Sequence, residues 1–496
     1  MLVDAARGLE RRLDEDRVTK PVEPGAIRAQ LAQRYDFQRE RPLAEIVSDI
    51  FEILYDGMVH PNHRRHFGLF VPGVRPSGVV ADALAALLNP QVGSWWYAPG
   101  ASELESFVLD AFAAKIGFDE GEQFSHFTTG GAEANMTAVV LALTRAFPEC
   151  RVAGLAASKR RPVLYASRRG HDSFTKIAHM VGIGRDAVRH IRTDCSDRLD
   201  LDDLRRQYTS DVRNGAQPFF VVGTAGTTAS GAFDPLSGLA AFKRETGLWF
   251  HVDAAWGGLA LLVEELRPLV SGIENADSVT WDAHKILPVP MGAGMFFART
   301  GVGLSKAFGV EPAYVPSARP GTLDLYQHSM QWSRRFIGLK VFLTLAELGW
   351  QGIESILRHQ QQMGQLLRDE LIREGFSLAN SSPLPLVCFS HPAVLSGRRT
   401  ADDVVMTLLA RGRVWVSSVR LSPDQPKAIR ACITNHRTSA DDVKCLVSEL
   451  ANALSPETID SAAQTRNEPA GPSTTGVRPA AKPPDAGIAR KRAPRK

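Results

Sequence analysis

The sequence predicts an α/β protein: a large domain with a mostly parallel sheet covered by helices, followed by a smaller α+β domain. From about Ser102, short apolar runs alternate with longer helical segments, as in strands joined by crossover helices. A second region, from about Gly349 to Leu454, mixes amphipathic helices with strand-like runs. No segment repeats at a fixed period, which excludes solenoid and propeller folds.

Continuously apolar runs of five to eight residues, most of them followed by turn or helix signals, are typical of strands buried on both faces. In the large domain we expect strands at residues 161–167, 219–224, 248–254, 278–283 and 292–298. In the smaller domain we expect them at residues 384–390, 413–419 and 429–434.

The domain boundaries follow from these patterns. Residues 1–101, with helical periodicity at 43–58 and 78–89, form an arm, residues 102–348 the large domain and residues 349–456 the small domain. Residues 457–496 hold eight Lys and Arg against four Asp and Glu, which accounts for the whole net charge of +4. This Pro-, Ala- and Gly-rich tail is predicted to be disordered. Its basic end is suited to acidic partners or nucleic acid, but we favour a solvated extension without function.

Composition places the chain among ordinary soluble proteins, with 44% hydrophobic and 23% charged residues. It has no apolar run of about 18 residues and no secretory leader pattern, so we expect no membrane segment and a cytoplasmic location. The five cysteines are widely spaced and show no ligand pattern. We therefore expect reduced thiols and no metal site.

Two strand ends carry the main chemical signal. The run SVTWDAHKILPVP delivers Lys285 where a strand stops, and an amine lining a cleft there could form a Schiff base with a carbonyl cofactor. The run LWFHVDAAWGG places Asp253 at the end of an apolar strand, where a protonated pyridine nitrogen would match its charge. Each residue taken alone also has another explanation. Lys285 could be an ordinary solvated lysine, and Asp253 could be a helix cap or a metal ligand.

Three further motifs are weaker. In FTTGGAEAN, Gly130 and Gly131 leave backbone N–H groups free at a helix start, which suits a phosphate; such a start is also a plain cap. His171 lies in a turn between a strand and a helix, where an imidazole can stack on an aromatic ring or serve a structural purpose. In VVGTAGTTASG, either Thr227 or Thr228 can direct a hydroxyl toward a cofactor.

These motifs resemble, in their order along the chain, the group II decarboxylases of amino acids that depend on pyridoxal 5′-phosphate (PLP). The resemblance extends from about His60 to Leu454 and implies fold type I, the aspartate-aminotransferase-like fold, and a homodimer. It also implies decarboxylation of an L-amino acid. Two alternatives remain: a different outcome on the same scaffold, such as oxidative deamination, transamination or another lyase reaction, and a non-catalytic scaffold that binds partners through the basic tail.

The resemblance also assigns site residues. It makes Lys285 the Schiff-base lysine, Asp253 the partner of the pyridine nitrogen and His171 the imidazole stacked on the ring opposite Ala255. The cofactor phosphate would be held by Thr129, Gly130, Gly131 and His284, and Thr228 would lie near the ring oxygen. The substrate would meet Phe70, Trp96 and Arg430, the last near its carboxylate.

The chain departs from the family pattern at several positions. Ile286 stands where the family usually has Trp, and Asp282 where the aromatic decarboxylases have Asn. Tyr326, the expected proton donor, is one position from the corresponding tyrosine of the family's loop. Leu69 and Phe70 replace an arm tyrosine of the aromatic decarboxylases, which argues against an aromatic substrate.

Overall fold

A computed structural model describes residues 7–8, 11–13, 17–119, 121, 123–310 and 321–455. The described residues up to Leu454 form one compact unit. The predicted disordered tail, residues 457–496, lies entirely outside the described residues. Within the described ranges, no helix is long and apolar enough to cross a membrane.

The larger of two sheets has seven strands in the order β1-β7-β6-β5-β4-β2-β3. Neighbours from β3 to β6 run parallel, and β7 is antiparallel to both β6 and β1. This confirms the predicted α/β class with a mostly parallel sheet. The strands are β1 (Phe124–Thr128), β2 (Pro162–Ser167), β3 (Val188–Ile191), β4 (Gln217–Thr224), β5 (Trp249–Asp253), β6 (Ser278–Asp282) and β7 (Gly294–Ala298).

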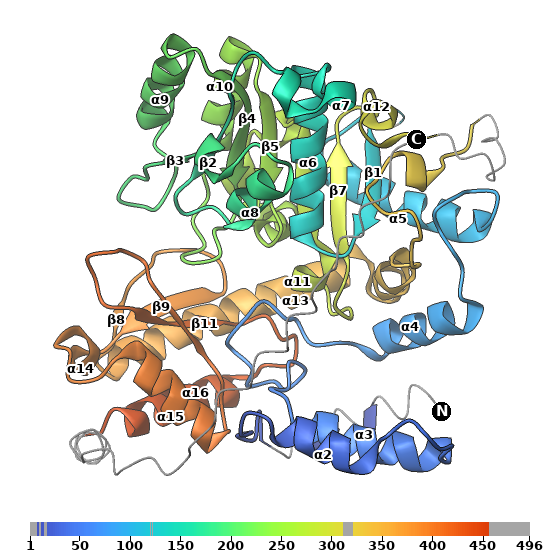
Figure 1. Ribbon diagram of the computed structural model, residues 1–496. Coiled ribbons are helices and arrows are strands. Elements are labelled where there is room, and N and C mark those ends of the chain that lie inside the picture. Colours follow the sequence, from blue (N-terminus) through green and yellow to red (C-terminus); the bar gives the residue numbers. More distant parts are fainter. Residues whose placement is uncertain are drawn as a thin grey trace, which may run out of the picture. The chain divides into compact units, whose positions relative to one another are not determined.

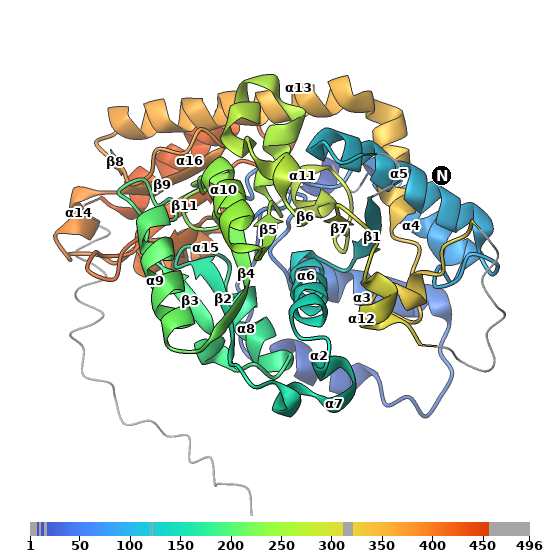
Figure 2. The same ribbon diagram turned by 90° about the horizontal axis from the view of Figure 1, so that it is seen from above.

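Helices cover both faces of this sheet (Figures 1 and 2). Side chains alternate along β2: Leu164 and Ala166 enter one hydrophobic cluster, and Val163 and Tyr165 the other. This two-sided burial explains why the strands are continuously apolar. One face packs against α6 (Gly131–Ala146), α8 (Ser173–Met180) and α12 (Leu304–Phe308); the other packs against α5 (Pro99–Ile116), α9 (Leu201–Arg213) and α10 (Leu236–Thr246).

The second sheet is antiparallel, in the order β10-β11-β9-β8, and belongs to the predicted small domain. Its strands are β8 (Ser377–Leu378), β9 (Leu386–Ser390), β10 (Ser417–Val419) and β11 (Ala428–Cys432), with α14 (Pro392–Leu395), α15 (Ala401–Arg411) and α16 (Ala440–Ala453) beside them.

The long helix α13 (Gly338–Arg373) joins the two parts: it packs against α5 and also against α16 (Figure 1). The buried Glu105 carboxylate accepts hydrogen bonds from the first backbone N–H groups of α13, at Ile337 (3.0 Å) and Gly338 (2.8 Å). The helix breaks at Gly349, with φ 61° and ψ 172°. A positive φ of this kind favours glycine, and the break adjoins the predicted domain boundary at residue 348, which remains a prediction.

The arm contains α2 (Ala26–Arg34), α3 (Leu43–Asp56) and α4 (Pro76–Leu88). Between α3 and α4 the chain pairs with the small domain: Phe67 N–H donates to Trp415 O (2.8 Å), and Cys432 N–H donates to Phe67 O (2.7 Å). Only residues 417–419 of the expected strand 413–419 belong to β10, because Trp415 pairs with the arm instead. Gly68 is required here, since a Cβ would lie 1.8 Å from the Trp415 ring.

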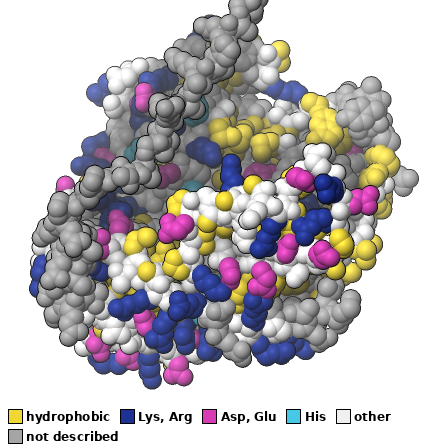
Figure 3. Space-filling model, turned by 60° about the horizontal axis from the view of Figure 1, so that its bottom comes forward, with side chains coloured by type: hydrophobic (Ala, Val, Ile, Leu, Met, Phe, Trp, Pro, Cys, Tyr) yellow, Lys and Arg dark blue, Asp and Glu magenta, His cyan; other side chains and the backbone are white. Residues whose placement is uncertain are grey.

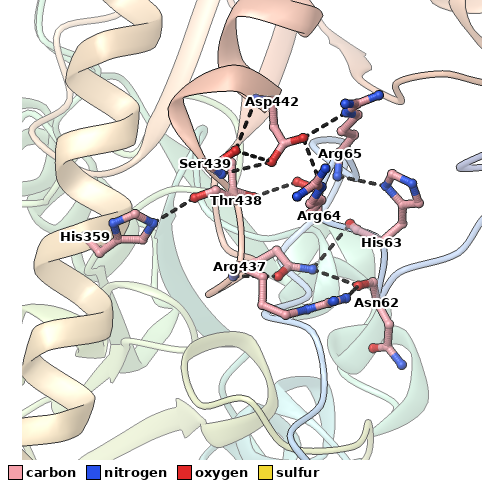
Figure 4. Close-up of polar contacts among 10 residues, drawn as sticks. Asn62, His63, Arg64, Arg65, His359, Arg437, Thr438, Ser439 and Asp442 are labelled. Atoms are coloured by element: carbon pink, nitrogen blue, oxygen red, sulfur yellow. Dashed lines mark hydrogen bonds and ion pairs between the residues drawn. The ribbon is translucent and has the colours of Figure 1, made fainter. Parts of the chain in front are cut away.

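Asp442, on the first turn of α16, ties the arm to the small domain (Figure 4). Its fully buried carboxylate is 2.8 Å from Nε of Arg65 and 3.2 Å from Nε of Arg64, and accepts from Oγ of Ser439 (2.7 Å). Burial alone would raise the pKa of Asp442, but the hydrogen bonds from Arg65 and Ser439 hold the pKa below its usual value. Thr438 Oγ1 also donates to Arg64 O (2.7 Å).

Asp442→Asn should loosen the arm, because the two arginines lose their buried anionic partner. We expect local opening of residues 60–71 to become easier by about 2 kcal/mol, or roughly thirtyfold faster amide exchange. Hydrogen exchange followed by mass spectrometry checks this, with exposed Asp441→Asn as the matched control. Equal exchange in the two variants would contradict this role for Asp442.

Candidate active site

A small cavity opens at the carboxyl ends of β4, β5 and β6, where ligand sites of parallel sheets are found. The loops after these strands, the start of α6 and the arm supply its walls. Of the residues predicted for the site, the structure brings together Phe70, Gly131, His171, Thr228, Asp253, Ala255 and Lys285.

Lys285 lies on α11 (Ala283–Ile286), a single turn that follows β6 directly. Its Nζ is 2.9 Å from Oδ2 of Asp282, and the Asp282 side chain is almost fully buried. Asp282 therefore holds the amine at the cavity through an ion pair, which a neutral Asn could not form. The lysine side chain itself is 25% exposed, so it can be reached from the cavity.

Asp253 is the last residue of β5 and is buried. Its Oδ2 accepts from Nδ2 of Asn135 (3.0 Å), and its Oδ1 accepts from Ala255 N–H (3.2 Å). In the described part of the chain, no ion pair joins Asp253 to a basic side chain. A buried carboxylate without a counter-charge fits a cationic group that enters from the cavity, such as a protonated pyridine.

The expected phosphate turn precedes α6, which begins at Gly131. A Cβ on Gly131 would lie 3.0 Å from Oδ2 of Asp282 and 3.3 Å from Cβ of Ala255, whereas one on Gly130 would meet nothing closer than 3.8 Å. The Gly131 backbone therefore lines the cavity closely, and a side chain there would crowd Asp282 and Ala255. The 16-residue helix that starts here presents free N–H groups and a positive dipole end, which suit an anion.

The three other predicted phosphate residues, Thr129, Gly130 and His284, are not part of the cavity lining. Both N–H and Oγ1 of Thr129 donate to Oε2 of Glu133, at 2.9 and 2.7 Å. His284 lies under the turn, with Cε1 of its ring 3.8 Å from the Cβ position of Gly130, and its Nδ1 accepts from Ala293 N–H (3.2 Å). Burial lowers the pKa of His284, which favours the neutral ring.

The loop after β4 places the two threonines considered from the sequence, Thr227 and Thr228, in different surroundings. Thr227 is buried, and its Oγ1 is engaged with Ser230 Oγ (3.0 Å) and Ala232 N–H (3.1 Å). Thr228 is exposed and lines the cavity. His171, in the connection from β2 to α8, also lines it, and its Nδ1 accepts from Ser173 N–H (3.2 Å).

The arm closes one side of the cavity with an aromatic stack. The ring of Phe70 lies 4.2 Å from that of Trp256, and the Arg430 guanidinium lies over the Phe70 ring at 4.7 Å. Arg430 is buried: Nε donates to Thr228 O and Nη1 to Gly68 O, both at 3.0 Å. Its Nη2 is buried with no hydrogen-bond partner among the described residues. Arg430 thus lies in a second layer, behind Phe70.

Two further predicted residues, Trp96 and Tyr326, also do not line the cavity within this chain. Trp96 is 42% exposed and packs edge-on against Tyr97. Tyr326 is buried; its hydroxyl accepts from Nε2 of Gln327 (2.9 Å), and its ring lies 5.2 Å from that of Trp332.

Asn135 and Trp256 are among the cavity residues to which the sequence had assigned no role. Asn135 lies four residues after Gly131, so the helical period places both on one face of α6. Trp256 lies three residues after Asp253 and is nearly fully buried. The spacing from Gly131 could have identified Asn135, but the stack of Trp256 on Phe70 depends on a contact between distant segments.

Residues 24–391 match the model of the pyridoxal-dependent decarboxylase conserved domain. The chain therefore belongs to this family, and it is a PLP-dependent amino-acid decarboxylase, a carboxy-lyase. The buried Asp253, the Gly131 backbone that lines the cavity and the accessible Lys285 amine all fit the ring, phosphate and aldehyde of PLP.

Similarity to individual proteins agrees. Cysteine sulfinic acid decarboxylase of Mus musculus is 32% identical over 408 residues, covering 79% of this chain and 82% of that protein. The acidic amino acid decarboxylase of the same species is 33% identical over 67% of this chain and 60% of its own length. A crystal structure of mouse CSAD in apo form superimposes with a TM-score of 0.82 at 28% identity, covering 88% and 94% of the two chains. This confirms the predicted family and fold type I.

Gly131→Ala should weaken PLP binding, because the new methyl group would press on Ala255 and the Asp282 carboxylate. We expect the dissociation constant for PLP to rise about fivefold. Gly301→Ala, outside the cavity, is the control, since its methyl group would meet only an ordinary contact with Phe124 (3.6 Å). Equilibrium dialysis of both holoenzymes checks this, and an equal loss in the two variants would mean that the space above Gly131 is not limiting.

Proposed function

We propose that the chain decarboxylates a small acidic L-amino acid to the corresponding amine, with PLP held by Lys285. The observation that carries this proposal is the cavity where Lys285, Asp253 and His171 meet, with the buried Arg430 behind its Phe70 wall. The similarity to decarboxylases of cysteine sulfinic acid and of acidic amino acids supports the substrate class.

Several residues have a proposed task toward the cofactor. Lys285 would hold PLP covalently, Asp253 would pair with its ring nitrogen, and His171 and Ala255 would lie against its ring. Bound PLP supplies an electron sink for the bond that breaks at the α-carbon. The remaining proposed contacts are those of the phosphate with Thr129, Gly130, Gly131 and His284, and of the ring oxygen side with Thr228.

We propose that Arg430 recognises a carboxylate of the substrate. Its Nη2 is the one nitrogen of this guanidinium without a hydrogen-bond partner among the described residues, and an unsatisfied buried donor is costly. Phe70 lies between Arg430 and the cavity, so the substrate would reach the guanidinium at the edge of this ring. The Phe70–Trp256 stack also narrows the cavity, which favours small substrates over aromatic ones.

We further propose that the enzyme is a homodimer and that its site is completed across the interface. The arm helix α3 leaves Leu43 75% and Leu54 60% exposed, and α4 leaves Leu87 81% exposed. Figure 3 shows hydrophobic side chains among charged ones on the face that includes the arm. Apolar patches of this kind mark contact surfaces, and a two-fold axis would pair equivalent patches.

The region of Tyr326 also belongs to this proposed interface. Trp96 and Trp332 are both about 40% exposed and lie on segments close to Tyr326. We propose that Tyr326 protonates the α-carbon of the substrate that is bound in the cavity of the partner subunit. Trp96 would contact the same substrate. For the compartment we propose the cytoplasm, where a free, exposed thiol such as Cys195 stays reduced.

A panel of L-amino acids tests the proposed substrate and product. We expect aspartate, glutamate or cysteine sulfinate to give equal amounts of carbon dioxide and amine, with kcat/KM at least about 100-fold above phenylalanine, tyrosine and tryptophan. Carbon dioxide with aldehyde and oxygen uptake would favour oxidative deamination instead. Preferred turnover of an aromatic amino acid would contradict the substrate class.

Arg430→Lys tests the carboxylate contact, because a lysine keeps the charge but loses the planar pair of donors. We expect KM for the best substrate to rise about tenfold, with kcat changed less. Arg398→Lys, at an exposed arginine of the same domain, is the control. An unchanged KM would show that Arg430 does not contribute to substrate recognition.

A further inference from the structure

A chain of buried side chains begins at Asp253 and Asn135, which both line the cavity, and continues into the sheet. Asn135 Nδ2 is 3.0 Å from Asp253 Oδ2, and Asn135 Oδ1 is 3.0 Å from Nε2 of His251. Nδ1 of His251 is 2.8 Å from Ser278 Oγ, which is 2.8 Å from Nε1 of Trp249. All five residues are buried, and they come from α6 and the neighbouring strands β5 and β6.

The direction of these hydrogen bonds follows from their chemistry. An ionised Asp253 can only accept, so the NH₂ group of Asn135 faces it and Oδ1 of Asn135 faces Nε2 of His251. The ring proton of His251 then lies on Nε2 and is donated to Oδ1 of Asn135. In the neutral ring, Nδ1 then accepts from Ser278, whose Oγ accepts from the Trp249 indole N–H. The donors of this chain thus lead toward the carboxylate, although the Asn135 NH₂ also donates to Ser173 Oγ (3.2 Å) and Nε2 of His251 also contacts Thr280 Oγ1 (3.3 Å).

The protonation state of His251 agrees with this direction. Burial lowers the pKa of His251 to about 4, so the ring is neutral at neutral pH and has one donor and one acceptor nitrogen. A doubly protonated ring could not accept from Ser278. Asn135 has no titratable proton, so the chain stabilises the charge on Asp253 without a path that would deliver a proton to it.

We propose that Asn135 and His251 are positioning residues that keep the Asp253 carboxylate ionised and aimed at the cavity, and so strengthen the hold on the PLP ring nitrogen. The inference rests on the proposed role of Asp253. Burial favours the protonated form of a carboxyl group, and the hydrogen bond that Asn135 donates to Oδ2 of Asp253 opposes this. Without His251, the Asn135 amide could turn and present its oxygen to Asp253, which would repel the carboxylate. Asn135 acts directly on the carboxylate, and His251 acts by orienting Asn135.

The variants Asn135→Leu and His251→Phe test this inference. His126→Phe is the matched control, because His126 is also fully buried in the same sheet, but neither of its ring nitrogens has a hydrogen-bond partner among the described residues. We expect the PLP dissociation constant to rise about tenfold in Asn135→Leu, severalfold in His251→Phe and not at all in the control. Asn135→Ala replaces Asn135→Leu if the larger side chain prevents folding, as judged by circular dichroism.

Nitrogen-15 NMR of enzyme loaded with PLP labelled at the ring nitrogen gives a second readout, independent of activity. We expect the signal of a protonated ring in the wild type and in the control, and a shift toward the neutral value in Asn135→Leu. In the Asp253→Ala background, Asn135→Leu should add less than about twofold to the PLP dissociation constant, because the two residues act as a unit.

The outcomes separate this inference from the proposed function. If Asp253→Ala neither weakens PLP nor changes the ring signal, the role of Asp253 is wrong. If Asp253→Ala does both while Asn135→Leu and His251→Phe match the control, Asp253 has its role and the positioning chain is refuted. Additive effects of Asn135→Leu and Asp253→Ala would likewise refute the chain, because they would mean a structural role independent of the carboxylate.

Discussion

The carboxylate of Asp253 is buried at the end of β5, and a buried charge is stable only where dipoles or an opposite charge compensate it. Asn135 and the Ala255 N–H compensate it from the protein side. The cavity side is left for a cationic ring. The other features of the site surround the same cavity. Lys285 lies on α11, after the neighbouring strand β6, and Asp282 holds its amine by an ion pair. The Gly131 backbone lines the cavity closely.

The site also depends on how the arm is fastened. Asp442 binds Arg64 and Arg65, the segment around Phe67 pairs with Trp415 and Cys432, and Phe70 is thereby set against Trp256. Residues from the arm, the large sheet and the small domain thus meet at one cavity. Along the chain, the break in α13 at Gly349 comes after the last strand of the large sheet and before the first strand of the small sheet. The helix is therefore interrupted between the two parts.

The strands that hold Lys285 and Asp253 were predictable because burial on both faces makes them continuously apolar and their ends are marked by polar residues. β1 and β3 were not predicted: Ser125 and His126 interrupt one, and Arg189 and His190 the other. The cofactor motifs were likewise readable from local order. Trp256 against Phe70, Arg430 behind it, and the contact of His251 with Asn135 were not, because each joins segments whose proximity only the tertiary packing creates. The different surroundings of Thr227 and Thr228 likewise depend on the loop geometry, although the family resemblance already favoured Thr228.

The central claim is that PLP is bound covalently by Lys285 in the cavity that Asp253 also lines. The most direct measurement is reduction of the loaded enzyme with borohydride, followed by proteolysis and mass spectrometry of the peptides. The account predicts a phosphopyridoxyl group on the peptide that contains Lys285, and none anywhere in the Lys285→Ala variant. Labelling of a different lysine, or equal labelling in that variant, would contradict it.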